Sequence, residues 1–98
     1  MKEAKSGAGA GRGVRTAGAA TFTWKDGAWT DTRIRPGMKT LKVKYLSDAY
    51  FALLRLRPRL KEALALGERV RVLAAEGRVI EVAPDGISEA AKVEAFLR

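Results

Sequence analysis

The chain has 98 residues, which is enough for one small domain with a single modest core. It contains neither cysteine nor histidine, and this excludes disulfide bonds, thiolate metal sites, cysteine nucleophiles and the Ser-His-Asp triad. Its 19 Lys and Arg residues against 11 Asp and Glu residues give a net charge of +8, which favours acidic partners. Hydrophobic residues make up 47% of the chain, too many for a wholly disordered protein.

The first twenty residues differ in composition from the rest. They hold five of the ten glycines, with alanine and basic residues between them. Such a segment has little apolar surface to bury, so we expect residues 1–20 to be a flexible Gly/Ala-rich basic tail and residues 21–98 to form a single domain. The glycine spacing does not match a nucleotide-binding loop, and the sequence has no apolar run typical of an export signal or a membrane span.

Alternating polarity and β-branched residues predict the strands. Residues 21–24 and 28–34 flank Asp26-Gly27, which is a strong signal for a hairpin turn. Residues 39–45 alternate between apolar and polar side chains, which predicts a half-buried strand with a basic outer face. A second hairpin is expected from residues 68–75 and 78–83.

Two helices are expected between these strand regions and a third at the end of the sequence. Ser47 is placed to cap the first, with Asp48 in its first turn, and Pro58 to open a second that runs to about Leu66. The third helix covers residues 89–97, with Ser88 as its cap. The predicted fold is α+β, with an antiparallel sheet of about five strands, a helical pair and a C-terminal helix.

The last twelve residues form a short amphipathic segment that needs a surface to pack on. Ile87, Ala90, Val93, Phe96 and Leu97 have roughly helical spacing, and so short a helix is marginal alone. Residues 87–98 are therefore expected to dock on their own sheet, and the alternative is a homodimer formed through the same residues.

Acidic residues are scattered along the sequence, and nothing brings two of them together as an acid–base pair. We expect Asp26 and Asp85 in turns, Asp31 in a strand and Asp48 at a helix start. Glu62, Glu76 and Glu89 are expected in solvated positions. We therefore assign no catalytic residue, no cofactor and no metal site from the sequence.

Basic residues carry more information, because they concentrate in the first two-thirds of the chain. A stripe of them beside two tryptophans would resemble a platform for single-stranded nucleic acid, in which cations hold the backbone and rings stack on bases. The residues of this candidate contact surface, for nucleic acid or for another partner, are Trp24, Trp29, Arg33, Arg35, Lys39, Lys42 and Lys44. The alternative is a solvated sheet face above two core tryptophans.

Four motifs give the chain a resemblance to a known family. They are Thr21-Phe22, Asp26-Gly27-x-Trp29-x-Asp31, Ser47-Asp48-Ala49-Tyr50-Phe51 and Ala65-Leu66-Gly67-Glu68. With them, residues 20–83 resemble the C-terminal region of bacterial proteins that combine a VIT (vault/inter-alpha-trypsin) domain with a von Willebrand factor A domain, as in inter-alpha-trypsin inhibitor heavy chains. The metal-binding Asp-x-Ser-x-Ser triplet of the A domain does not occur in this sequence, and the VIT part is missing too, so the resemblance covers only the region that follows both.

The resemblance implies a role in adhesion or protein–protein contact, since proteins of that family are usually exported or surface-associated. We therefore expect a non-enzymatic protein-interaction or structural module, such as an accessory domain of a surface protein, with an unidentified protein partner. The alternative is a basic nucleic-acid-binding domain. The two differ in salt dependence, because phosphate contacts weaken steeply with ionic strength.

Overall fold

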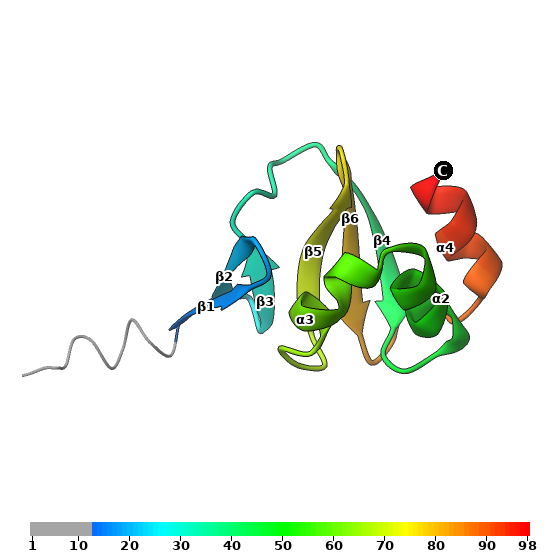
Figure 1. The fold of residues 1–98 in the computed structure, drawn as a ribbon, viewed down its shortest axis with the longest axis horizontal. Coiled ribbons are helices and arrows are strands. Elements are labelled where there is room, and N and C mark those ends of the chain that lie inside the picture. Colours follow the sequence, from blue (N-terminus) through cyan, green and yellow to red (C-terminus); the bar gives the residue numbers. More distant parts are fainter. Residues whose placement is uncertain (1–12) are drawn as a thin grey trace, which may run out of the picture.

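A computed structural model describes residues 13–98, which form an α+β fold around one six-stranded sheet. The strands lie side by side in the order β1-β2-β3-β5-β6-β4 (Figure 1). Their bounds are Val14–Ala17 (β1), Ala20–Lys25 (β2), Ala28–Asp31 (β3), Lys39–Lys44 (β4), Val70–Ala75 (β5) and Arg78–Ala83 (β6). The predicted α+β class is confirmed.

Strand β1 lies in the segment whose composition predicts a tail. It pairs antiparallel with β2, from Val14 opposite Thr23 to Ala17 opposite Ala20. A left-handed Gly18, with φ of 63°, makes the tight turn between the two strands. The sheet therefore begins at Val14 rather than near Thr21, and the remaining predicted tail residues, 1–12, lie outside the described part of the chain.

The sheet is mixed, which corrects the expectation of an antiparallel sheet of about five strands. β3 pairs with β5 and β4 pairs with β6 in parallel, and the other neighbours are antiparallel. The reason is the connection through residues 32–38, which crosses over β5 and β6 and carries the chain to the far edge of the sheet (Figure 1). Because β4 then lies at the far edge, β5 and β6 fill the space between it and β3, and each of them is parallel to the strand that it meets there; a tight turn cannot join such a parallel pair.

Both predicted hairpins form where their turn residues indicate. Asp26 and Gly27 have φ values of 53° and 79°, as a two-residue turn with two left-handed positions requires. This turn brings Trp24 opposite Trp29. The second hairpin turns at Gly77, whose φ of 70° is again left-handed.

The helices lie on one face of the sheet and at its β4 edge (Figure 1). They are α2 (Asp48–Leu56), a 3-10 turn at Pro58–Leu60 that runs into α3 (Lys61–Leu64), and α4 (Ala90–Leu97). Ser47 caps α2 as predicted, since its hydroxyl accepts a hydrogen bond from the Tyr50 N–H at 3.3 Å. Ser88 does not cap α4; its carbonyl instead accepts a bond from the Ala49 N–H at 3.0 Å, which ties the two helices together.

A single core fills the space between the helices and the sheet. Alternation along β5 turns Val70, Val72 and Ala74 toward the helices, as the sequence pattern predicts. The large buried side chains that join them are Phe22, Val43, Leu53, Leu60, Leu64, Ile80, Val82 and Val93. Side chains from β1, β2 and β3 also pack into this core, so the first hairpin and the helices belong to one packed unit.

Helix α4 packs within its own chain. It lies against α2, and Val93 and Leu97 are buried in the same core. Its contact with the sheet is smaller than expected, and includes the Arg78 guanidinium 5.6 Å from the centre of the Phe96 ring. The docking surface of residues 87–98 is thus mainly another helix rather than the sheet.

The loop before α4 is held closely against strand β4. Ile87 bonds to both neighbours of Val43: its N–H donates to the Lys42 carbonyl at 2.9 Å and its carbonyl accepts from Lys44 at 2.8 Å. A Cβ placed on Gly86 would lie 2.3 Å from the Val43 carbonyl carbon, so only glycine fits there. This loop covers part of the outer edge of β4, which would otherwise be open to another strand.

Replacing Gly86 with alanine should destabilise the protein, because backbone rather than a flexible side chain fills the space. We expect Gly86→Ala to lower the free energy of unfolding by about 1–3 kcal/mol or more. Gly13→Ala is the matched control, since its added Cβ meets nothing within 4 Å and Gly13 is not left-handed. Urea denaturation of both variants measures this, and equal stabilities would contradict the close approach.

Candidate functional site

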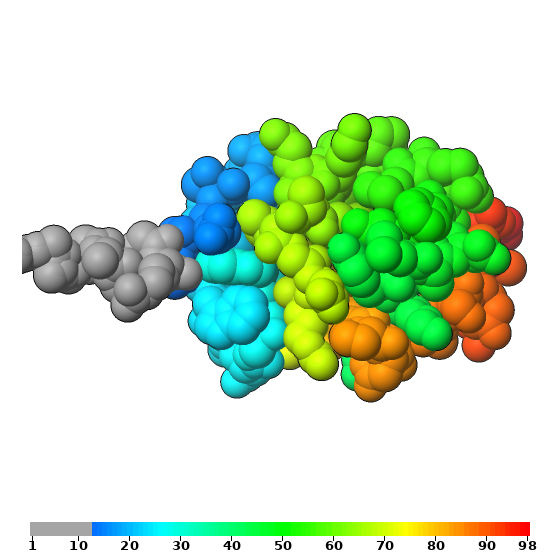
Figure 2. All heavy atoms as spheres, turned by 90° about the horizontal axis from the view of Figure 1, so that it is seen from below, coloured from blue at the N-terminus to red at the C-terminus, as the bar shows by residue number. Residues whose placement is uncertain are grey.

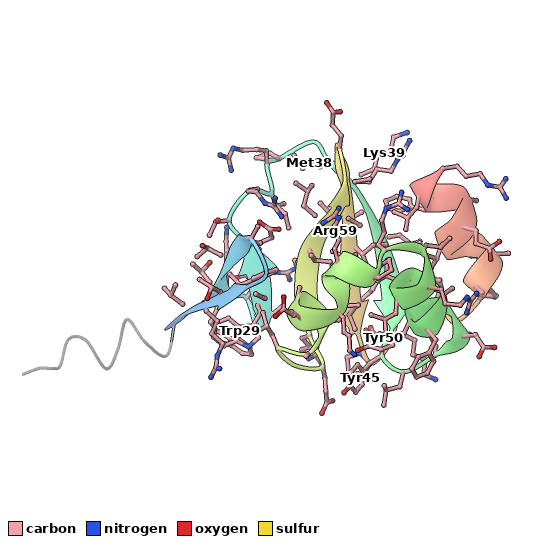
Figure 3. All side chains as sticks on the ribbon, in the orientation of Figure 1. Trp29, Met38, Lys39, Tyr45, Tyr50 and Arg59 are labelled. Atoms are coloured by element: carbon pink, nitrogen blue, oxygen red, sulfur yellow. The ribbon has the colours of Figure 1, made fainter. Side chains whose placement is uncertain are left out.

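The strand directions divide the molecule into two ends with different side chains. β2, β4 and β6 finish at the lower end in Figure 1, where β3 and β5 begin. Figure 3 places Trp29, Tyr45 and Tyr50 toward this lower end, and Met38 and Lys39 at the upper end. The predicted contact residues are therefore distributed between two separate surfaces.

The two tryptophans meet at the lower end. Their rings form an edge-to-face pair with centroids 5.3 Å apart, and the Arg15 guanidinium lies 5.1 Å from the centre of the Trp29 ring. Trp29 is only 8% exposed, whereas Trp24 is 54% exposed. Trp29 is thus a core residue, and Trp24 is a surface residue. Each of the two alternatives from the sequence describes one of the tryptophans.

An open groove of about 360 Å³ lies beside this pair, which we call the tryptophan groove. Its lining residues are Trp24, Trp29, Leu66, Gly67, Glu68 and Arg69. A Cβ on Gly67 would come within 3.7 Å of the Trp29 ring, so the backbone there lies close to the indole. Figure 2, which looks onto the lower end, shows the segment before β5 beside the β2–β3 turn. Arg15 and residues 66–69 were not predicted here, because the β1–β2–β3 pairings bring Arg15 to Trp29 and the β3–β5 pairing brings residues 66–69 there.

Cations gather at the opposite, upper end, which we call the basic end. Lys39 and Arg78 are opposite each other in the β4–β6 register, and both line an open groove of about 520 Å³ with Arg35. Arg33 and Arg59 line a separate cavity, and Arg57 lies beside the end of α4. The set that we group as the basic end comprises Arg33, Arg35, Lys39, Arg57, Arg59 and Arg78. Three of these were predicted. Arg57, Arg59 and Arg78 were missed because they come from the residue after α2, from the 3-10 turn and from β6.

The predicted stripe of cations beside the tryptophans is not one surface. Lys42 and Lys44 lie on the sheet face turned away from the helices, on the same face as Glu81, and Lys42 pairs with the exposed Asp85 at 3.0 Å. Strands β5 and β6 separate β4 from β3, so these lysines lie far across the sheet from Trp29. Only Arg33, Arg35 and Lys39 of the predicted cations belong to the basic end.

Asp31 ends strand β3, which confirms its predicted place in a strand, and it is the one buried charged residue among those described, at 1% exposure. Its carboxylate accepts hydrogen bonds from the Arg33 backbone and from the Arg33 guanidinium, at 2.8–3.1 Å, and a longer one of 3.4 Å from the Leu73 N–H of β5. Burial alone would raise the pKa of Asp31, but the bonds and charge of Arg33 outweigh it and the pKa is lowered. We call this arrangement the Asp31 clasp.

The Asp31 clasp should make stability depend on pH. The pKa of Asp31 in the folded state lies below the unfolded value of about 3.9. Ionised Asp31 therefore stabilises the fold fully above a pH of about 3.9, and this stabilisation is lost as the pH falls from there through the folded-state pKa. We expect Asp31→Asn to cost about 1–3 kcal/mol at pH 7 and much less at pH 3. Urea unfolding at both pH values measures this. Asp85→Asn is the control with an exposed ion pair; a loss as large as that of Asp31→Asn would refute the special role of the clasp.

Comparisons with protein-family models, with curated proteins and with solved structures find no match for this chain. Within residues 13–98, no three acidic side chains come together as a metal site. No helix in that range is long and apolar enough to cross a membrane.

Proposed function

We propose that the protein is a non-enzymatic interaction module that binds a partner protein through the tryptophan groove. The observation that carries this proposal is the exposure of Trp24, which leaves more than half of a large apolar side chain in water beside an open groove. Tryptophan and arginine are the residues most enriched at the energetic centres of protein interfaces, and this groove presents Trp24 with Arg69 at its rim.

The groove suits recognition better than catalysis. Its charged lining consists of Glu68 and Arg69, and it holds no serine, threonine or lysine that would act as a nucleophile. Trp29 is buried in the core, and its ring packs edge-to-face against Trp24. This contact restricts the Trp24 side chain before binding, so that binding costs little further side-chain entropy. An apolar side chain of a partner would fill the groove and cover the exposed indole.

The family resemblance supports the same proposal. Two of its four motifs, residues 26–31 and 65–68, come from opposite sides of the β3–β5 pairing and supply Trp29, Leu66, Gly67 and Glu68 to the groove. We propose on these motifs that the chain is related to the region that follows the VIT and von Willebrand A domains. An accessory, contact-making role in a surface protein fits that relationship.

Selection from a displayed library of random peptides tests the proposal without a known partner. Peptides retained by the wild type should contain apolar anchors, and Trp24→Ala should weaken their binding by about 30-fold, as the loss of a central interface residue does. Phe51→Ala is the matched control, because Phe51 is a similarly exposed aromatic residue outside the groove. Its affinity should stay within about twofold of the wild type. Peptides that bind the Trp24→Ala protein as well as the wild type would rule the groove out.

A further inference from the structure

We propose that the basic end is a second, independent binding site, and that it takes the phosphate backbone of a nucleic acid. Four strand ends and the segments beside them bring its cations together, although they are spread over residues 33–78 of the sequence. Figure 3 shows Lys39 at the upper end of the sheet and Arg59 in front of β5. The tryptophan groove is at the other end of the strands, so the two sites do not overlap.

Most of these cations have no carboxylate partner. Among residues 13–98, the only ion pair that any of them makes is Arg33 with the buried Asp31. Glu76 lines the groove of Arg35, Lys39 and Arg78, but it pairs with none of them. The same holds for Glu62, which lines a cavity with Arg33 and Arg59, and for Glu94 beside Arg57. The positive charge of the basic end is therefore available to a ligand.

Three guanidinium groups are held in place by backbone carbonyl groups. Arg57 donates to the Leu97 carbonyl at 3.2 Å and Arg59 to the Ala74 carbonyl at 2.9 Å. Arg35 donates to two carbonyl groups of its own loop at 3.0 and 3.3 Å. A carbonyl fixes the orientation of a guanidinium without neutralising its charge, and it leaves other N–H donors unused. Ordering these side chains on binding consequently costs less than ordering free ones.

The distribution of the cations favours a polymer of phosphates over a peptide. Arg33, Arg35, Lys39 and Arg78 lie at or beside the upper ends of β3, β4 and β6. The row of strands from β3 to β4 is roughly 15 Å wide at the usual strand spacing, which suits a backbone with one charge after another. Of the described aromatic residues, Phe96 lies at this end, but it is partly buried, packs against the core and is in contact with Arg78. The exposed aromatic residues, Trp24 and Phe51, do not line this groove, so an exposed ring for a peptide anchor or for base stacking is lacking among the residues that do. Binding should therefore be independent of base sequence and strongly dependent on salt.

Fluorescence anisotropy with a labelled 20-nucleotide oligothymidine and with a 20-base-pair duplex tests this inference. The wild type should bind at 50 mM salt, and the triple variant Arg35→Gln/Lys39→Gln/Arg78→Gln should bind at least tenfold more weakly. Its slope of log affinity against log salt should be smaller by about 2–3 for the duplex, one unit for each lost phosphate contact. The preferred probe identifies which form of nucleic acid is the ligand. If the triple variant is unstable, the double variant Arg35→Gln/Lys39→Gln replaces it, because it keeps the Arg78–Phe96 contact. The double variant should lose affinity in the same way but to a smaller extent.

The matched control is Lys25→Gln/Lys42→Gln/Lys44→Gln, which removes the same charge from outside the basic end. It should bind within about threefold of the wild type, as should Trp24→Ala, so this test is separate from that of the tryptophan groove. The inference is overturned if the wild type does not bind, if both triple variants lose affinity equally, or if a poly-glutamate peptide of equal charge competes as well as the oligonucleotide. The last outcome would assign the basic end to acidic proteins.

Discussion

The short parallel pairing between β3 and β5 is the constraint on which the rest of the molecule depends. It joins the β1–β3 meander to the other half of the sheet through only two registered pairs, Trp29 with Val70 and Thr30 with Arg71. The Asp31 clasp extends this connection to the last residue of β3, where the Asp31 carboxylate accepts a hydrogen bond from the Leu73 N–H and Arg33 supplies the opposite charge. A buried carboxylate is stable there because all of these donors converge on it, and loss of one would leave a buried charge poorly compensated.

Both candidate surfaces follow from this connection. At its lower end it places the meander's tryptophans against residues 66–69, and the tryptophan groove forms between parts of the chain about forty residues apart. At its upper end it fixes the point from which residues 32–38 leave β3 and cross to β4, which brings Arg35 and Lys39 next to Arg78. An apolar groove and a cluster of cations thus occupy opposite ends of a single packed unit.

Local signals in the sequence were sufficient for most elements but not for their arrangement. Asp26-Gly27 specifies a turn and Ser47 a helix start through contacts within a few residues, and both form as predicted. The parallel pairings depend on a crossover that no local pattern encodes, so the strand order and the grouping of Arg57, Arg59 and Arg78 were missed. β1 was missed because its residues contribute hydrogen bonds to β2 but little apolar burial. Asp31 was missed because its partners include a backbone N–H more than forty residues away.

The ionisation of Asp31 is the most direct test of this account, because a clasp exists only if the buried carboxylate stays charged. An NMR titration that follows the Asp31 side-chain carboxyl carbon measures its pKa in the folded protein. The account predicts a midpoint below the ordinary value of about 3.9, since Arg33 and the Leu73 N–H both favour the charged form. A midpoint at or above that value would show that burial outweighs those partners and would contradict the clasp.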